Sequence, residues 1–291
     1  MPHACIDVGS NTTRLLVADA EDGVRPLLER RAFTRIGSSV SRDGLIPARK
    51  IDETAEVVAA YAALAREHGC ATIVAVATAA VRQAPNRAEL RREVEARAGL
   101  VVRILSPAEE ARLAFAGATS ALSAGGSDRI LVADVGGGST EVVVGTVAGG
   151  SAWSRSCPIG SGTLADRLLR SDPPTAAELD AVRRRVAEAL AELAPPPADH
   201  AFAVGGSATS LVRVVGQELG PAELERALHA LTTSRVAELA DRFELDRERV
   251  RLLRAGVLVF EGLSRRLGMV LEIGAGGLRE GLVLELEALQ S

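Results

Sequence analysis

The sequence predicts an α/β fold made of two related halves, and three observations indicate it. Apolar runs rich in β-branched residues alternate with segments that carry apolar residues at helical spacing. Several of these runs end in glycine-rich loops, the place where open α/β sheets bind their ligands. The same order of strand, acid and glycine-rich turn occurs near the N-terminus and again at the centre of the chain.

The central stretch Ile130–Gly145 is predicted to be a β-hairpin with chemistry at its tip. Both arms are crowded with β-branched residues, and consecutive glycines allow the positive φ angles of a tight turn. Glycines also let backbone N–H groups converge on an anion, as in the nests that hold phosphate. The predicted phosphate-binding residues of this loop are Gly136, Gly137, Gly138 and Ser139.

Two carboxylates, Asp134 and Glu141, bracket this loop. If the hairpin forms, both face the same side and can hold a divalent cation beside a phosphate. Mg²⁺ is the expected ion, with Mn²⁺ as the alternative, because Mg²⁺ is commonly shared between one or two carboxylates and substrate phosphates. A glycine-rich turn with two solvated acids is the structural alternative.

The chain contains three further loops of this kind. Ala4–Asp19 is a strand, a turn at Gly9, Ser10 and Asn11, and a second strand; aligning its Asp7 with Asp134 places Thr12 opposite Ser139. A third loop, Ala201–Thr209, contains Gly205, Gly206 and Ser207, and a fourth is Glu272–Gly281. We interpret the repetition as two halves that close on one phosphate-containing ligand.

Composition excludes several other classes of protein. The chain has 291 residues, 47% of them hydrophobic, a net charge of −4 and a pI near 5.7. This disfavours disorder and a broad nucleic-acid or membrane surface. No apolar run reaches the roughly 18 residues that span a bilayer, so a cytoplasmic protein is expected. Three separate cysteines and four scattered histidines form neither a disulfide framework nor a metal pattern.

Periodicity and breakers divide the chain into two predicted domains, residues 1–125 and 126–291, joined by the small-residue linker Ser123–Ser127. The last helix could pack back on the first domain. The expected elements of the first domain, after its hairpin, are a strand in Val24–Arg35, a loop entered at Ile36–Val40, a helix over Glu53–His68 that stops at Gly69, a strand over Cys70–Thr78, a helix over Arg87–Ala98, a short strand over Val101–Leu105 and a helix from Ser106.

The same signals predict the elements of the second domain. After the central hairpin, a glycine-rich turn over Pro158–Leu164 precedes a helix, and Pro195–Pro197 is a stiff connector. The remaining expected elements are helices over Thr175–Leu193, Ser210–Val215, Glu223–Leu231, Ser234–Phe243, Arg247–Leu267 and Leu282–Leu289, with strands over Ala201–Val204 and Met269–Ile273.

Two charged residues of the first domain are candidates for binding or catalysis. Arg82 follows small residues at a strand end and could contact an anion, although a solvated arginine is the common alternative. Ser106 and Glu109 are predicted to form a capping box at the start of the helix from Ser106, so Glu109 has a structural role. Glu110 is left to complement the helix dipole or to orient and deprotonate a water molecule that attacks phosphate.

The run Arg183–Arg185 lies on a long amphipathic helix of the second domain. It could reach an elongated polyanion, but a solvated helix face is the more common explanation.

With these motifs in place, the chain resembles the exopolyphosphatase and guanosine pentaphosphate phosphohydrolase family. That family has the two-domain actin, hexokinase and Hsp70-like (ribonuclease H-like) ATPase fold with a cleft between its domains. The motifs that carry the resemblance run in family order: Ile6–Leu15, Thr78–Arg82, Glu109–Leu113, Asp134–Glu141, Gly205–Thr209 and Gly277–Gly281.

The resemblance implies a role for each matching position. Glu110 would be the catalytic base, Asp134 and Glu141 would bind the cation, Arg82 would contact the substrate anion, and the glycine-rich loops would hold phosphates. Water would attack a terminal phosphoryl group in line. The chain is similar to the short two-domain members, and a homodimer is a family-level expectation.

Two positions depart from the family pattern. Gln83 stands where an aspartate often follows the arginine, so a carboxylate that orients Arg82 is missing there. Gly160-Ser161-Gly162 replaces a more usual single glycine followed by an apolar residue.

The leading hypothesis is a Mg²⁺-dependent exopolyphosphatase that releases orthophosphate from inorganic polyphosphate, with short chains expected because the chain lacks room for the extra helical domain of processive members. Hydrolysis of pppGpp to ppGpp is the alternative within the class. A nucleotide base needs apolar or aromatic surface to bind. The chain has few aromatic residues, and this scarcity favours polyphosphate as the substrate. A polyphosphate or alarmone sensor with little turnover, and an ATPase or sugar kinase of the same fold, are the alternatives outside it.

Overall fold

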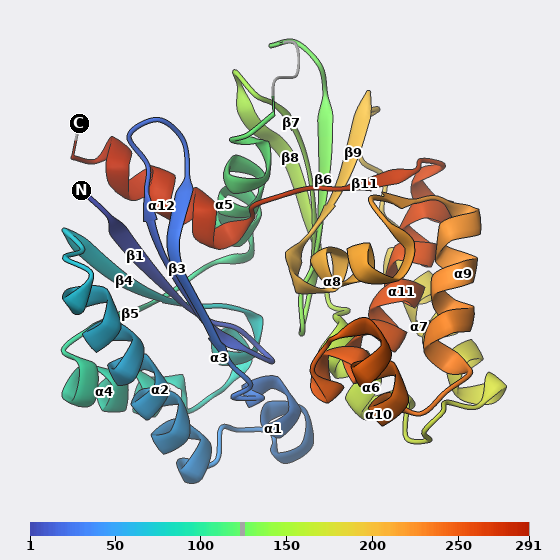
Figure 1. The fold of residues 1–291 in the computed structure, drawn as a ribbon, viewed down its shortest axis with the longest axis horizontal. Helices are drawn as coiled ribbons and strands as arrows, with labels where there is room; N and C mark the ends of the chain where they lie inside the picture. Colours follow the sequence, from blue (N-terminus) through green and yellow to red (C-terminus); the bar gives the residue numbers. More distant parts are fainter. Residues whose placement is uncertain (123–125, 291) are drawn as a thin grey trace. The chain divides into compact units, whose positions relative to one another are not determined.

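The computed structural model describes residues 1–122 and 126–290. The chain divides into two compact units, one formed by Met1–Ser123 with Gly276–Ser291 and the other by Ala124–Ala275 (Figure 1). The C-terminal segment therefore belongs to the first unit. The predicted linker Ser123–Ser127 overlaps residues 123–125, which lie outside the described residues, so that boundary stays a prediction.

The sheet of the first unit has the strand order β3-β2-β1-β4-β5. The strands β1, β2 and β3 form an antiparallel meander, whereas β4 and β5 run parallel to β1. Their bounds are β1 His3–Val8, β2 Thr13–Asp19, β3 Arg25–Ala32, β4 Thr72–Ala77 and β5 Val102–Ile104.

Helices cover both faces of this sheet. Alternation along β1 places Ile6 in a core with α2 and α4, and Cys5 in a second core with α5 and α12. The helices are α1 Ile36–Asp43, α2 Ala48–Glu67, α3 Ala79–Gln83, α4 Arg87–Ala98, α5 Pro107–Thr119 and α12 Leu278–Ala288.

The sheet of the second unit repeats the same topology. Its order is β10-β11-β9-β6-β7-β8, in which β6, β7 and β8 form an antiparallel meander and β9 and β11 continue parallel to β6. The bounds are β6 Ile130–Val135, β7 Thr140–Thr146, β8 Gly150–Cys157, β9 His200–Val204, β10 Glu218–Leu219 and β11 Leu271–Ile273. The two units thus share one arrangement of five strands, and the predicted α/β fold of two related halves is confirmed.

The helices of the second unit pack around one large core that includes Phe260, Leu211 and Val186. The central helix of this packing, α11, contacts the five other described helices of the unit, among them α7 (Figure 1). The bounds are α6 Ser161–Leu168, α7 Ala176–Leu190, α8 Gly205–Val215, α9 Pro221–Thr232, α10 Val236–Phe243 and α11 Arg247–Leu267.

Four expected loops prove to be wholly or partly helical. Ile36–Val40 lies in α1, the turn expected over Pro158–Leu164 enters α6 at Ser161, the third glycine-rich loop forms the first turns of α8 from Gly205 onward, and Leu278 already begins α12. Glycine and serine have low intrinsic helix propensity, so these segments gave no helical signal in the sequence. At Gly205 a φ of 87° lets the chain turn directly from β9 into α8.

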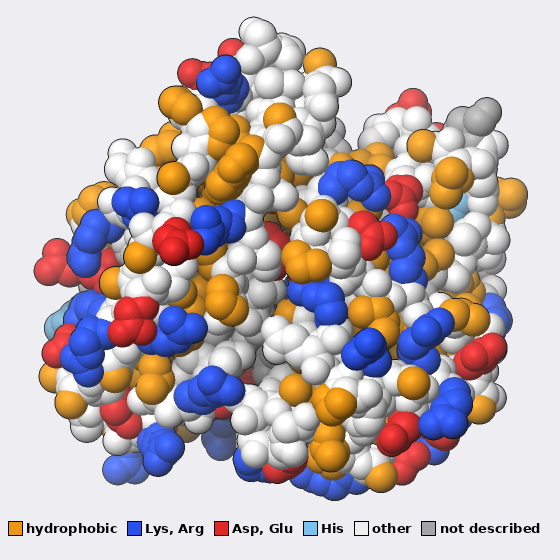
Figure 2. Space-filling view, turned by 180° about the vertical axis from the view of Figure 1, so that it is seen from behind, with side chains coloured by type: hydrophobic (Ala, Val, Ile, Leu, Met, Phe, Trp, Pro, Cys, Tyr) orange, Lys and Arg blue, Asp and Glu red, His pale blue; other side chains and the backbone are white. Residues whose placement is uncertain are grey.

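Charged side chains of both signs occur on the surface that can be seen in Figure 2. On the face shown in Figure 2, basic and acidic side chains are interspersed, in keeping with the small net charge. Within the described ranges, no helix is both long and apolar enough to cross a membrane.

Candidate functional site

The central hairpin has the predicted register. Asp134 of β6 and Glu141 of β7 lie directly opposite each other in the antiparallel ladder, so both side chains project from the same face of the sheet. Glu141 is buried, and its Oε1 accepts a hydrogen bond from Ser156 Oγ at 2.7 Å. The two predicted metal-binding carboxylates are therefore held together by strand pairing.

The loop between these carboxylates is closed by a hydrogen bond from the Gly136 N–H to the Ser139 carbonyl, at 3.0 Å. The first turn of α6 then holds its carbonyl oxygens. The N–H groups of Ser161 and Thr163 donate to the carbonyls of Gly136 and Gly137, both at 2.9 Å, and the Ser161 hydroxyl adds a bond of 3.2 Å to Gly136.

These bonds fix the direction of the neighbouring N–H groups. In a planar trans peptide the N–H points away from the carbonyl of the same unit. Because the Gly136 and Gly137 carbonyls face α6, the N–H groups of Gly137 and Gly138 point away from it. Two successive N–H groups turned to one side form an anion-binding nest.

The departure at Gly160-Ser161-Gly162 is explained by this contact. A Cβ atom on Gly160 would lie 2.6 Å from the Gly137 carbonyl oxygen, and one on Gly162 would lie 2.9 Å from the same atom. Both distances are shorter than side chains tolerate. The two glycines let α6 approach the backbone of the loop, so the replacement serves the loop instead of weakening it.

The segment Gly205–Ser207 forms the start of α8, next to the hairpin. Gly205 lies so close to the Asp134 carboxylate that a Cβ atom there would overlap Oδ1. Ser207 is buried, and its hydroxyl donates to Ser161 Oγ at 3.3 Å. Gly256 of α11 leaves room for this pair, since its Cβ would lie 3.0 Å from Ser207 Oγ. The Ser207 side chain thus joins α8 to α6 inside the unit.

The N-terminal loop of the first unit is built in the same way. The Gly9 N–H donates to the Thr12 carbonyl at 3.1 Å, the bond equivalent to the one from Gly136 to Ser139. The start of α1 then holds the loop, because the N–H of Gly37 donates to the Ser10 carbonyl at 2.6 Å and that of Arg35 to the Asn11 carbonyl at 3.0 Å. In each unit, the helix after the third strand holds the carbonyls of the first hairpin.

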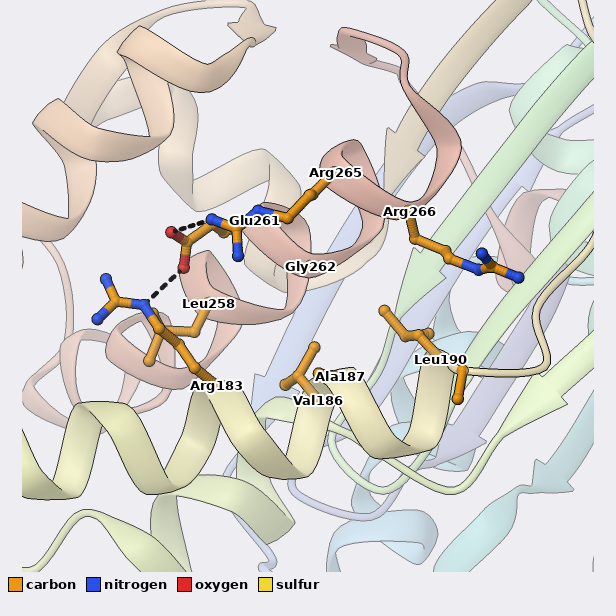
Figure 3. A pocket seen from close by; sticks show the side chains of 10 residues that line it. Arg183, Val186, Ala187, Leu190, Leu258, Glu261, Gly262, Arg265 and Arg266 are labelled. Carbon is orange, nitrogen blue, oxygen red and sulfur yellow. Dashed lines mark hydrogen bonds and ion pairs between the residues drawn. The ribbon is translucent and has the colours of Figure 1, made fainter.

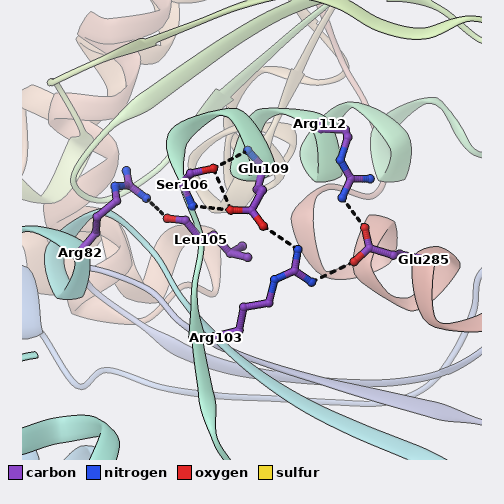
Figure 4. A network of polar contacts seen from close by, with 7 residues as sticks. All are labelled: Arg82, Arg103, Leu105, Ser106, Glu109, Arg112 and Glu285. Carbon is purple, nitrogen blue, oxygen red and sulfur yellow. Dashed lines mark hydrogen bonds and ion pairs between the residues drawn. The ribbon is translucent and has the colours of Figure 1, made fainter. Parts of the chain in front are cut away.

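Glu110 and Arg82 are brought together by the fold. The Arg82 Nη1 donates to Glu110 Oε2 at 2.9 Å and to the Leu105 carbonyl at 2.7 Å (Figure 4 shows the Leu105 contact). Glu110 is buried and lies in the first turn of α5, where the helix dipole favours a carboxylate. The ion pair and the carbonyl orient Arg82 without the aspartate that Gln83 replaces.

The capping box that starts α5 is confirmed. The Glu109 N–H donates to Ser106 Oγ at 3.2 Å, and Glu109 Oε2 accepts from the Ser106 N–H at 2.9 Å. Arg103 bridges Glu109 and Glu285 of α12, which ties α5 and α12 to β5 (Figure 4). The bonds from Arg103 and Ser106 lower the pKa of Glu109 to about 2.

This lowered pKa predicts a pH dependence of stability. The ionised Glu109 stabilises the folded state above its unfolded pKa of about 4.3, and this contribution is lost as the pH falls toward 2. The Glu109→Gln variant is expected to be less stable than the parent at pH 6 by no more than about 1 kcal/mol, since the side chain is over a third exposed. Urea unfolding at pH 6, 4 and 2 measures it; a difference that stays constant would contradict the assignment.

One carboxylate was not among the predicted site residues. Asp7, at the end of β1, has a buried Oδ1 without a hydrogen-bond partner among the described residues. Burial raises its pKa, while the charges of Arg14 and Arg279 act in the opposite direction. The alignment of Asp7 with Asp134 in the two hairpins was the signal that could have identified it. An oxygen buried without a partner is unusual and suggests a ligand.

The residues present suit a cation with oxygen ligands. Asp134 and Glu141 offer carboxylate oxygens from one face, and Mg²⁺ needs no more than one or two of these beside substrate phosphates. In the part of the chain that the structure describes, no group of three or more histidine, cysteine, aspartate or glutamate side chains is arranged so that it could hold a metal ion. A metal cage made by the protein alone is therefore not found among those residues.

Residues 16–290 match the Ppx/GppA phosphatase family. Exopolyphosphatase 1 of Mycobacterium leprae is 32% identical over 302 residues, covering 96% of this chain and 87% of that protein. Exopolyphosphatase 1 of Mycobacterium tuberculosis H37Rv is 33% identical, covering 96% and 86%.

Solved structures agree. The Aquifex aeolicus member of the Ppx/GppA family is 28% identical, with a TM-score of 0.83 over 100% of this chain and 99% of that one. An exopolyphosphatase from Cytophaga hutchinsonii, 21% identical, shares the fold with a TM-score of 0.86 over 99% and 98%. The predicted resemblance, the fold class and the prediction of a phosphatase are confirmed. The chain belongs to the Ppx/GppA phosphatase family.

Proposed function

We propose that this chain is a Mg²⁺-dependent exopolyphosphatase that releases terminal orthophosphate from inorganic polyphosphate. The observation that carries the proposal is the loop Gly136–Ser139, in which α6 turns the N–H groups of Gly137 and Gly138 to one side and which is flanked by the paired carboxylates Asp134 and Glu141. The curated relatives named exopolyphosphatase, which align with 96% of this chain, support the same substrate class.

Each residue has a chemical task in this proposal. Glu110, held by Arg82, orients the attacking water and accepts its proton. The N–H groups of the segments at Gly9–Asn11, Gly136–Ser139 and Gly205–Ser207 bind phosphate oxygens, so their contribution is positioning and charge stabilisation. Asp134 and Glu141 would hold Mg²⁺, which when bound neutralises charge on the phosphates.

The aromatic residues favour polyphosphate over a guanine nucleotide. A base requires apolar or aromatic surface, but three of the seven aromatic side chains, Tyr61, Phe115 and Phe260, are buried. Trp153 and Phe243 pack against the core of the second unit. Few aromatic rings are left to stack on a base. Hydrolysis of pppGpp remains the second candidate because the phosphate-binding loops would serve both substrates.

The test is phosphate release from short-chain polyphosphate, long-chain polyphosphate and pppGpp in parallel, with Mg²⁺ and with EDTA. Release from polyphosphate that EDTA abolishes is expected, and the two chain lengths establish the size preference. Faster release from pppGpp would replace the proposed substrate. Binding of polyphosphate without release from any of the three would identify a sensor and overturn the proposal. Mn²⁺ added after EDTA treatment tests the alternative ion.

Substitution of Asp7 is expected to affect phosphate release and the free energy of unfolding in different ways. A buried carboxylate oxygen without a partner destabilises the folded state, and Asp7→Asn removes the charge at nearly constant shape. Because burial raises the pKa of Asp7 in the folded state, stability falls as the pH rises above the ordinary carboxyl pKa of about 3.9, so at pH 7 the variant is expected to be as stable as the parent or more stable by about 1 kcal/mol.

Phosphate release by the same Asp7→Asn variant is expected to fall at least about tenfold, the equivalent of 1.4 kcal/mol in the barrier. Urea unfolding and the release assay measure the two effects on one preparation. Asp22→Asn, at an exposed position of the same unit, is the matched control and should change neither. A less stable Asp7→Asn protein with full activity would show that Asp7 is purely structural.

A further inference from the structure

The second unit contains a pocket that the proposed chemistry does not use. It lies between α7 and α11 and has a volume of about 280 Å³ (Figure 3). Each helix contributes residues at the same spacing: positions 183, 186, 187, 190 and 191 of α7 or just past its end, and 258, 261, 262, 265 and 266 of α11. This is the spacing of one helix face, so two facing stripes form the walls.

The floor of the pocket is aliphatic. Val186, Leu190 and Leu258 are buried core residues that also line the pocket. Gly262 brings the helices together at one point, since a Cβ there would overlap Val186. Ala187, on the exposed side of α7, is too small to fill the space. At about 30 Å³ for each molecule of liquid water, the volume equals about nine waters. This space suits a small organic molecule and is too small for a partner helix.

The rim of the pocket carries three arginines and one acid. Glu261 accepts from Arg183 Nε at 3.0 Å and from Arg265 Nη2 at 3.2 Å, so one carboxylate holds two of the arginines (Figure 3). Arg183 is also the member of the Arg183–Arg185 run that lines the pocket.

Arg266 differs from these two arginines. Its side chain extends the other way, past Leu190, and its Nε donates to the Leu193 carbonyl at 2.8 Å (Figure 3). Neither terminal nitrogen of this guanidinium has a hydrogen-bond partner within residues 1–122 and 126–290. Arg266 is exposed at the edge of the aliphatic pocket, and its Nε bond to the Leu193 carbonyl leaves both terminal nitrogens available to a ligand. A guanidinium whose two terminal nitrogens have no partner can donate two parallel hydrogen bonds to one carboxylate.

We propose that this pocket binds an aliphatic monocarboxylate, with the chain on Val186, Leu190 and Leu258 and the carboxylate on Arg266. The absence of aromatic residues from the lining favours an alkyl chain over a flat ring. A net charge of +2 on the rim favours an anion over a neutral lipid. The site is independent of the proposed hydrolysis and can be tested without it.

Isothermal titration calorimetry with decanoate, below the concentration at which it forms micelles, tests the proposal. One decanoate is expected to bind per chain. Acetate, which lacks the chain, and 1-decanol, which lacks the charge, are expected to bind at least about tenfold more weakly. Equal binding of 1-decanol would overturn the role of the charge, and no saturable binding of decanoate would overturn the site.

Two variants locate the binding. Arg266→Gln removes the open guanidinium and is expected to weaken decanoate binding about tenfold, whereas Ala187→Leu fills the pocket from an exposed position and should abolish it. Arg184→Gln, an exposed neighbour that does not line the pocket, is the matched control and should bind like the parent. Decanoate binding that is unchanged in both Arg266→Gln and Ala187→Leu would place the ligand elsewhere and refute the proposal.

Discussion

Replacing Glu110 by glutamine is expected to lower the kcat of phosphate release by about 10²- to 10⁴-fold, the range that general base catalysis contributes. The amide oxygen can still accept the hydrogen bond of Arg82, so the local structure is retained. What the amide cannot do is accept a proton from water. KM is expected to stay within about twofold, because the effect of removing a base lies in the transition state.

The neighbouring Glu109 supplies the matched control for this experiment. Glu109 and Glu110 lie side by side in the first turn of α5, but Glu109 is engaged by Ser106 and Arg103. Glu109→Gln should therefore reduce stability slightly and leave kcat unchanged. Glu110→Gln should lower kcat and leave stability unchanged. Full phosphate release by Glu110→Gln would remove Glu110 from the role of base, and equal losses in both variants would point to a structural cause.

The second large effect is expected at Gly160. This residue has an extended backbone, with φ −145° and ψ 156°, so alanine is permitted there by its own conformation. The added methyl group would meet the Gly137 carbonyl oxygen at 2.6 Å and the Gly138 nitrogen at 2.5 Å. Both are backbone atoms that cannot rotate away. The loop that carries the predicted phosphate-binding N–H groups must move.

A displacement of about 1 Å in a positioning element can cost about 10²-fold in rate, and we expect a loss of that order in kcat/KM for Gly160→Ala. Overpacking should reduce the stability of the protein by about 1–3 kcal/mol. Gly126→Ala is the matched control, since its methyl group would meet no described atom within 4 Å. Phosphate release assays and urea unfolding of both variants test this. Unchanged kinetics in Gly160→Ala would show that the loop does not position phosphate.

Much of the candidate site could be predicted from the chain because its parts are local. The hairpin at Asp134 and Glu141, and the capping box at Ser106, involve residues a few positions apart, so β-branched arms, glycines and a serine and glutamate three residues apart were sufficient. The repetition of the hairpin likewise predicted two related sheets, which the strand orders bear out.

The helices that hold the glycine-rich loops could not be predicted in this way. The start of α1 holds the loop at Ser10, and the start of α6 holds the loop at Gly136, over about 25 residues in each case. The segment Ile36–Val40 has little helix propensity of its own, so its helical state depends on tertiary contacts. Gly160 looked like a departure from the family pattern until its contact with Gly137 was seen.

The sequence by itself determined the alternation of strands and helices, the order of the motifs and the chemical identity of the acids, glycines and arginines. Only the tertiary structure decided which of these act together: Arg82 with Glu110, Ser161 with Ser207, and the arginines of α7 and α11 around one pocket. The physical reason is that propensity and periodicity act over a few residues, whereas hydrogen bonds and close packing join segments far apart in the chain.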